Sequence, residues 1–77
     1  RLYRVLRGIR EAVRGGSREF SRLERRAYDE LAANGWLPQY VAVRRRVDLS
    51  EATEGDELVV LAAAKLGSTR LIDNLEI

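Results

Sequence analysis

The 77-residue sequence has no cysteine, no histidine and no methionine. The absence of cysteine excludes a disulfide framework and a cysteine-ligated zinc site, and it fits a protein of the cytoplasm. Without histidine the chain lacks the commonest general base at neutral pH. Its carboxylates are scattered, and no serine sits in the setting of a nucleophile. We therefore expect no catalytic, cofactor-binding or metal-binding residue in this chain.

Long hydrophobic runs and a strong charge of one sign are also missing. No apolar stretch reaches the roughly 18 residues of a membrane span, and no stretch of these 77 residues has the pattern of a secretory leader. Fourteen basic residues face twelve acidic ones, for a net charge of +2, and Lys65 is the only lysine. This small imbalance is weak support for a nucleic-acid partner. The length predicts one domain with a thin hydrophobic core.

The first half of the chain has the spacing of two amphipathic helices. Apolar residues recur every three to four positions from Leu2 to Val13 and again from Phe20 to Leu31. Gly15-Gly16 ends the first stripe, because glycine takes the left-handed conformation that closes helices. Ser17 is predicted to cap the second helix, and Asn34-Gly35 to end it. The pattern predicts a helical hairpin with a very short loop.

The second half changes to the period of β-strands. Residues 40–47 alternate between apolar and polar, whereas residues 58–66 are almost continuously apolar and fit either a helix or a buried strand. We prefer the strand, because Gly67-Ser68 suits a two-residue hairpin turn that leads into a returning strand at 69–77. Residues 48–56 are predicted to be a loop. The expected fold is α+β and two-layered: a two-helix hairpin packed on a three-stranded antiparallel meander.

Two short motifs have both a functional and a structural interpretation. Arg44-Arg45-Arg46 is a candidate for phosphate binding, but alternate residues of a strand point to opposite faces and cannot act as one cluster. A solvated strand edge is the preferred interpretation, although Arg45 shares its predicted face with valines. Gly15-Gly16-Ser17 resembles an anion-binding turn, and the end of one helix beside the start of the next explains it fully.

Asp73 breaks the apolar pattern of the last predicted strand. It shares a face with Leu71, Leu75 and Ile77, and a carboxylate in such a row needs a partner or access to water. The preferred interpretation is a salt bridge or hydrogen bonds that fix the sheet edge, with Arg45 as one possible partner. In the alternative, Asp73 and Asn74 face a neighbouring domain.

The end of the sequence resembles a known enzyme family. Residues 58–74, L-V-V-L-A-A-A-K-L-G-S-T-R-L-I-D-N, are similar to the C-terminal end of the pantoate–β-alanine ligases, which close with an apolar strand, a glycine turn and T-R-L-I-D-N. Residues 34–44, N-G-W-L-P-Q-Y-V-A-V-R, resemble the entry to a strand in that family, so the resemblance spans nearly the whole chain. Residues 48–56 depart from the family's D-x-x-T-L pattern.

This resemblance implies an ATP-dependent ligation that forms AMP. Pantoate attacks the α-phosphorus of ATP with magnesium present, and the amine of β-alanine then displaces AMP from pantoyl-adenylate. The family's paired histidines lie in an N-terminal nucleotide-binding domain and have no match here. The chain opens on Arg1 inside a helical pattern, as expected of a piece of a longer protein. We therefore expect residues 1–77 to be the C-terminal lid domain, with no catalytic activity alone.

The partners implied by the resemblance follow from this assignment. They are the nucleotide-binding domain of the same polypeptide and the substrates pantoate, β-alanine and ATP, in a cytoplasmic enzyme that is a homodimer. ATP and magnesium are expected to bind outside this chain, and nucleic acid and membranes are not expected as partners. Arg70, Asp73 and Asn74 are the candidate contacts across the closing interface. The alternatives are a small basic nucleic-acid-binding module and a protein-interaction module.

Overall fold

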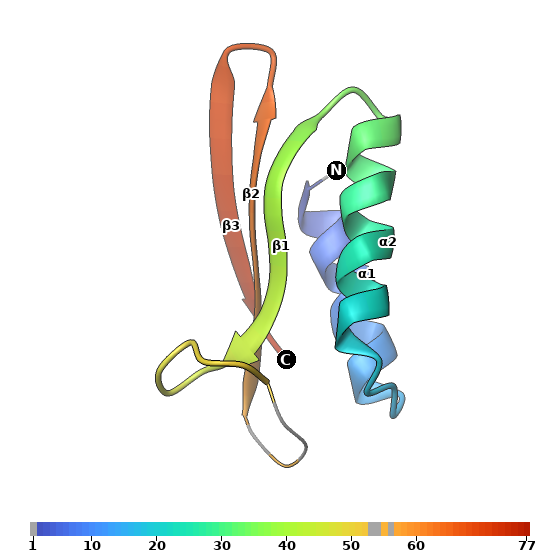
Figure 1. Cartoon of the computed structure of the whole chain (residues 1–77), viewed down its shortest axis with the longest axis vertical. Helices are drawn as coiled ribbons and strands as arrows, with labels where there is room; N and C mark the ends of the chain where they lie inside the picture. The colour runs from blue at the N-terminus through green and yellow to red at the C-terminus, as the bar shows by residue number, and fades with distance from the viewer. Residues whose placement is uncertain (1, 53–54, 56) are drawn as a thin grey trace.

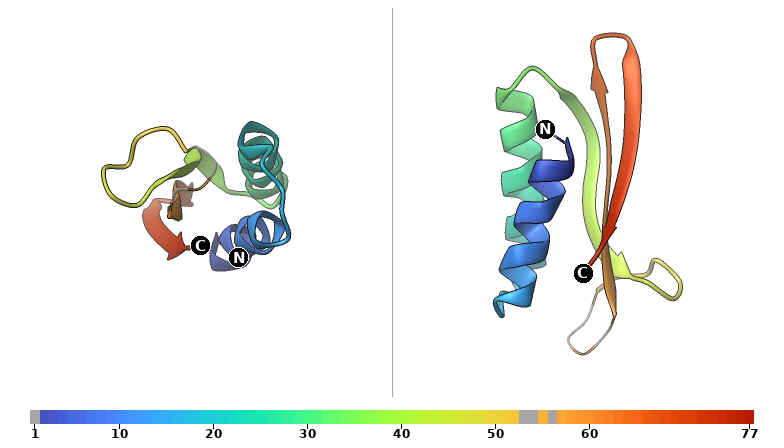
Figure 2. Two further views of the ribbon diagram at one scale, coloured as in Figure 1. Left: turned by 90° about the horizontal axis from the view of Figure 1, so that it is seen from below. Right: turned by 180° about the vertical axis from the view of Figure 1, so that it is seen from behind.

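Two helices lie on one face of a three-stranded antiparallel sheet in the computed structural model, which describes residues 2–52, 55 and 57–77. The strand order is β1-β2-β3, so the sheet is a meander. Figures 1 and 2 show the helical layer beside the sheet in every view, which confirms the two-layer α+β fold. The elements are α1 (Leu2–Arg14), α2 (Phe20–Ala33), β1 (Leu37–Arg45), β2 (Leu58–Leu66) and β3 (Thr69–Glu76).

The helices form where the apolar stripes predicted them. Every buried residue of α1 belongs to the predicted stripe. A Schellman motif closes α1, because Gly16 has φ +109° and Ser17 donates its N–H to the Ala12 carbonyl. Ser17 therefore serves the end of α1, and its predicted role as the cap of α2 is wrong. The residue before α2 is Glu19, whose side chain makes no capping hydrogen bond.

The middle strand β2 is buried on both faces, as its continuous apolar run predicted. Leu58, Val60, Ala62 and Ala64 face the helices, while Val59 and Ala63 are buried on the opposite side. Gly67, with φ +64°, and Ser68 form the turn to β3, and Leu66 pairs with Thr69 across it. These observations confirm the strand interpretation of residues 58–66.

The first strand begins and ends earlier than predicted. It spans Leu37–Arg45 instead of 40–47, with a bulge between Pro38 and Tyr40. It ends at Arg45 because the chain turns back, with Leu49 donating its N–H to the Arg45 carbonyl. The predicted loop at 48–56 contains positions 53, 54 and 56, which lie outside the described residues, as does Arg1 of the predicted first helix.

The sheet has one face covered by helices and one uncovered face, which we call the outer face. Alternation along the strands places Val41, Val43, Leu71 and Asp73 toward the helical layer. The β2–β3 hairpin extends past the ends of both helices (Figure 1). The outer face carries Leu37 and Ala42 of β1, Val59, Leu61, Ala63 and Lys65 of β2, and Arg70, Ile72, Asn74 and Glu76 of β3.

Candidate functional site

The three candidate residues of β3 do not share one face of the sheet. Arg70 and Asn74 pair with Lys65 and Leu61 and lie on the outer face, whereas Asp73 pairs with Ala62 and lies toward the helical layer. Arg70 and Asn74 are exposed and Asp73 is half-buried. Only Arg70 and Asn74 are therefore available together to a surface that approaches the outer face.

Arg70 is held in place by a neutral partner from the far strand. Its Nε donates a hydrogen bond to Gln39 Oε1 at 2.6 Å, across the width of β2. This bond orients the guanidinium and adds no negative charge. The two terminal nitrogens of Arg70 make no hydrogen bond or ion pair with any described residue, so they remain available to an acceptor outside the chain.

Asp73 bonds within its own strand, and Arg45 is not its partner. Its Oδ1 accepts the backbone N–H of Asn74 at 2.8 Å. Arg45 pairs with Leu58, four residues along β2 from the partner of Asp73, which corresponds to about 13 Å. Arg45 instead approaches Asp48, with Nη1 at 3.8 Å from Oδ2. The suggested Asp73–Arg45 salt bridge is therefore wrong, and the hydrogen bond of the Asp73 carboxylate is to the next residue of its own strand.

Each arginine of the Arg44–Arg46 triplet meets a carboxylate in a different place. Arg44 Nη1 lies 3.5 Å from Glu24 Oε2 on α2, and Arg45 meets Asp48. Arg46 bridges two glutamates, with Nη1 at 3.3 Å from Glu57 Oε2 and Nη2 at 3.0 Å from Glu76 Oε2. The prediction that they do not form one cluster is confirmed. The triplet gives no support to a nucleic-acid site, although the carboxylate partners were not foreseen.

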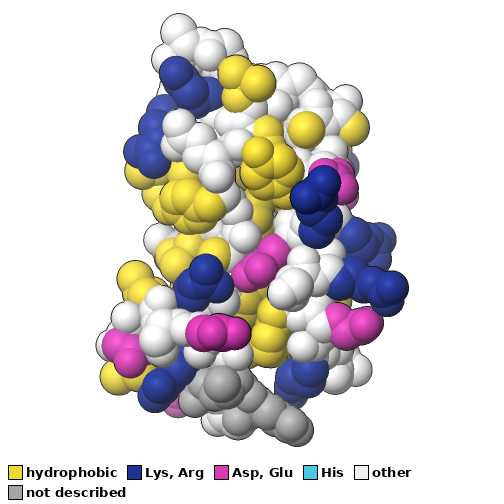
Figure 3. All heavy atoms as spheres, viewed as in Figure 1, with side chains coloured by type: hydrophobic (Ala, Val, Ile, Leu, Met, Phe, Trp, Pro, Cys, Tyr) yellow, Lys and Arg dark blue, Asp and Glu magenta, His cyan; other side chains and the backbone are white. Residues whose placement is uncertain are grey.

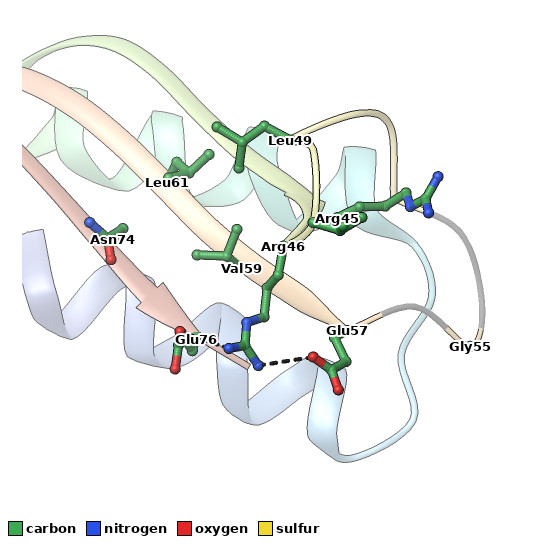
Figure 4. Close-up of a pocket in the computed structure, with 10 residues that line it drawn as sticks. Arg45, Arg46, Leu49, Gly55, Glu57, Val59, Leu61, Asn74 and Glu76 are labelled. Carbon is green, nitrogen blue, oxygen red and sulfur yellow. Dashed lines mark hydrogen bonds and ion pairs between the residues drawn. The ribbon is translucent and has the colours of Figure 1, made fainter.

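Arg46 and its two glutamates form one wall of a groove on the outer face. The groove has a volume of about 700 Å³, and its floor is formed by Val59 and Leu61 of β2 (Figure 4). Asn74 lies on the β3 side, which places one candidate residue at this groove. The sequence signal that was missed is a pair of glutamates at the same end of the sheet. Glu57 precedes β2, and Glu76 is the last residue of β3.

A second groove, of about 650 Å³, lies where the start of α2 meets β1. It is lined by three arginines and three glutamates, so its formal charges balance. Because α2 begins at Phe20, Gly15-Gly16-Ser17 does not form an anion-binding turn at its N-terminus. The charged residues of this groove are Arg18, Arg22, Arg44, Glu19, Glu24 and Glu51.

The pKa of Asp48 lies below its ordinary value of 3.8, chiefly because Ser50 donates its hydroxyl and its backbone N–H to the carboxylate, the latter at 3.0 Å. Arg45 adds a weaker attraction.

Asp48 therefore stabilises the fold above its unfolded-state pKa, and this contribution is lost as the pH falls through the lower folded-state value. We expect Ser50→Ala to raise the pKa of Asp48 in a carboxyl NMR titration. Ser21→Ala, on exposed α2 surface, is the control, and an unchanged Asp48 pKa in S50A would contradict this cause.

The described part of the chain does not supply a set of metal ligands. Within it, no group of three or more Asp, Glu, His or Cys side chains is placed to hold a metal ion. None of the described helices is long and apolar enough to cross a membrane.

One comparison with known proteins identifies the family. The family model of pantoate-β-alanine ligase matches residues 1–76, so the match covers both helices and all three strands. It includes T-R-L-I-D-N of β3, which carries Arg70, Asp73 and Asn74. The chain belongs to the pantoate-β-alanine ligase family, the ligases of pantothenate biosynthesis.

Proposed function

We propose that this chain is the C-terminal lid of an ATP-dependent, AMP-forming pantoate–β-alanine ligase. In this proposal the reacting groups belong to an N-terminal nucleotide-binding domain of the same polypeptide, which also binds ATP and magnesium. The complete enzyme would act in the cytoplasm as a homodimer on pantoate, β-alanine and ATP. The chain alone would be non-catalytic.

The observation that carries this proposal is the difference between the two faces of the sheet. One face is covered by α1 and α2, and the other presents Arg70 and Asn74 with no layer over them. A lid needs such a rigid surface with polar groups free to meet a second domain. Arg46, which follows the last residue of β1, pairs with Glu57 and Glu76, so these ion pairs leave Arg70 and Asn74 available.

The lid contributes by excluding water from the adenylate. An acyl-adenylate is hydrolysed if water reaches it before the amine does, so closure protects the intermediate and favours attack by β-alanine. Closure also completes the contacts that hold the substrates in a reactive arrangement. In this proposal the residues of this chain help to hold the substrates and exclude water, and they take no part in forming or breaking bonds.

A direct test compares the isolated chain with the complete ligase. The isolated chain should release no pyrophosphate from ATP in the presence of pantoate and β-alanine, whereas the complete enzyme should release it. Pyrophosphate release by the purified 77-residue chain would overturn the lid assignment.

A second test changes Asp73 in the complete enzyme. Asp73→Ala removes the acceptor of the Asn74 N–H and should loosen the segment that carries the candidate contacts. We expect lower turnover or increased hydrolysis of the adenylate, measured as AMP formed in excess of pantothenate. Asp29→Ala is the matched control, because Asp29 is an exposed carboxylate on α2 whose ion pair with Arg25 spans one helical turn. Parental turnover together with parental stability in D73A would show that Asp73 does not support the candidate contacts of the closing interface.

A further inference from the structure

Two cations stand directly opposite each other on the outer face. Lys65 of β2 pairs with Arg70 of β3, and both side chains project from the same face. Like charges placed directly opposite on neighbouring strands destabilise a sheet. Leu37 of β1 pairs with Lys65 in turn, so Leu37, Lys65 and Arg70 form one row across all three strands.

No carboxylate of the described chain neutralises this pair. Among the described residues, the Arg70 side chain makes a hydrogen bond only with the amide of Gln39, and Lys65 enters no hydrogen bond or ion pair. Glu57 and Glu76 lie at the opposite end of the sheet, where both bind Arg46. The outer face is therefore neutralised at one end and carries two uncompensated positive charges at the other.

Large apolar side chains surround the two cations. Leu37 is 66% exposed and Ile72, the next residue of β3 on this face, is 61% exposed. Figure 3 shows basic and hydrophobic side chains next to one another over the upper part of the sheet. An exposed apolar patch that carries charge of one sign is typical of a protein-binding surface. We call Leu37, Lys65, Arg70 and Ile72 the hairpin patch.

The chemistry of the hairpin patch favours a protein carboxylate as its counterpart. Neither cation lines either of the two grooves described above, so neither groove is a small-ligand site for this pair of charges. Two unpaired cations without an aromatic residue between them are few for a nucleic-acid strand. The Gln39 contact fixes Arg70 Nε and leaves the other two nitrogens for a carboxylate. An acidic surface with exposed aliphatic groups complements both parts of the patch.

We infer that the hairpin patch is the surface through which the lid docks on an acidic, partly apolar surface of the nucleotide-binding domain; this inference rests on the proposed lid function. Docking brings carboxylates to Lys65 and Arg70 and relieves their mutual repulsion. It also removes Leu37 and Ile72 from water. The open lid retains the unfavourable charge pair, so the closed state gains stability from the same two residues, and salt weakens it.

The experiment uses the complete ligase with both charges reversed, Lys65→Glu with Arg70→Glu. Backbone hydrogen exchange is measured with and without saturating ATP and pantoate, together with small-angle scattering and turnover. In the parent, substrates should protect the amides of the β2–β3 hairpin and compact the enzyme. In K65E/R70E this protection should disappear and turnover should fall about tenfold or more. Lys65→Met with Arg70→Gln, which removes charge without reversing it, should give a smaller loss.

The matched control is Arg4→Glu with Arg7→Glu, which makes the same charge change on the exposed side of α1. It should keep turnover within about twofold of the parent, because long-range effects of exposed charges are screened. Thermal unfolding of each variant separates docking from folding. An equal loss of turnover in the control, or a loss in K65E/R70E that only follows reduced stability, would overturn the inference.

Failure of the docking surface and failure of the lid function give different results. If substrates compact the parent but K65E/R70E closes and turns over normally, the hairpin patch is wrong and the lid function stands. If substrates neither compact the parent nor protect any amide of residues 2–77, the lid function itself is wrong.

Discussion

Replacing Leu6 with alanine is expected to leave most of the chain unfolded at room temperature. Leu6 on α1 has no exposed surface and packs in the cluster that joins both helices to the sheet. Truncating a buried leucine costs about 2–5 kcal/mol through lost apolar burial and a residual cavity. A domain of this size without disulfides has a total stability of only about 3–5 kcal/mol. The loss therefore approaches the whole free energy of unfolding.

Urea denaturation followed by tryptophan fluorescence measures this loss. Trp36 is the only tryptophan and is buried between the helices and the sheet, so its emission reports the packing that Leu6 supports. Leu37→Ala is the matched control, because it removes the same atoms from a side chain that is 66% exposed. It should change the free energy of unfolding by about 0.5 kcal/mol or less. Similar effects of L6A and L37A would contradict the assigned core.

Replacing Glu24 with alanine is expected to give the second largest loss, about 1.5–3 kcal/mol. Glu24 Oε2 accepts the backbone N–H of Val43 at 2.7 Å and lies 3.5 Å from Arg44 Nη1. The carboxylate thus joins α2 to the edge strand β1, with its side chain only 23% exposed. Alanine leaves the Val43 N–H without its acceptor in a partly buried position, which is more costly than losing an exposed ion pair.

Glu24→Gln separates the hydrogen bond from the charge. The glutamine carbonyl retains an acceptor for Val43, so E24Q should recover most of the stability lost in E24A, measured in the same urea titration. Hydrogen exchange at Val43 gives a local readout, because its amide should exchange faster in E24A and remain protected in E24Q. If the Val43 amide is equally protected in E24A, the carboxylate does not hold this edge.

The sequence predicted the elements whose hydrophobic period matches their final surroundings. The stripe from Leu2 to Val13 became the buried side of α1, and the continuous run at 58–66 became the central strand β2, which has buried residues on both faces. In these segments local propensity and tertiary burial demand the same conformation, so the pattern was sufficient. The start of β1 was less predictable, because a bulge after Pro38 interrupts the alternation.

The contacts of the charged residues could not be predicted from the sequence pattern. Glu24 and Val43 are 19 residues apart, and the packing of α2 against β1 alone brings them together. The Arg46 bridge likewise needs the exact register of three strands, and a shift of one residue would send Glu76 to the other face. The pairing of Lys65 with Arg70 follows from the predicted two-residue turn at Gly67-Ser68, whereas the contact of Arg70 with Gln39 depends on the placement of β1 and could not be predicted.

The hydrogen bonds of the two outer strands also influence where a sheet of this kind can add a further strand. On β1 the outward N–H of Val43 is taken by Glu24 and that of Arg45 by the Ser50 carbonyl. On β3 the alternation points the N–H groups of Arg70, Ile72, Asn74 and Glu76 away from β2. Of these four groups, only that of Asn74 has an acceptor among the described residues, the side chain of Asp73. The outer edge of β3 therefore has more unpaired N–H groups than the end of β1 around Val43 and Arg45, and a further strand would add more readily to β3.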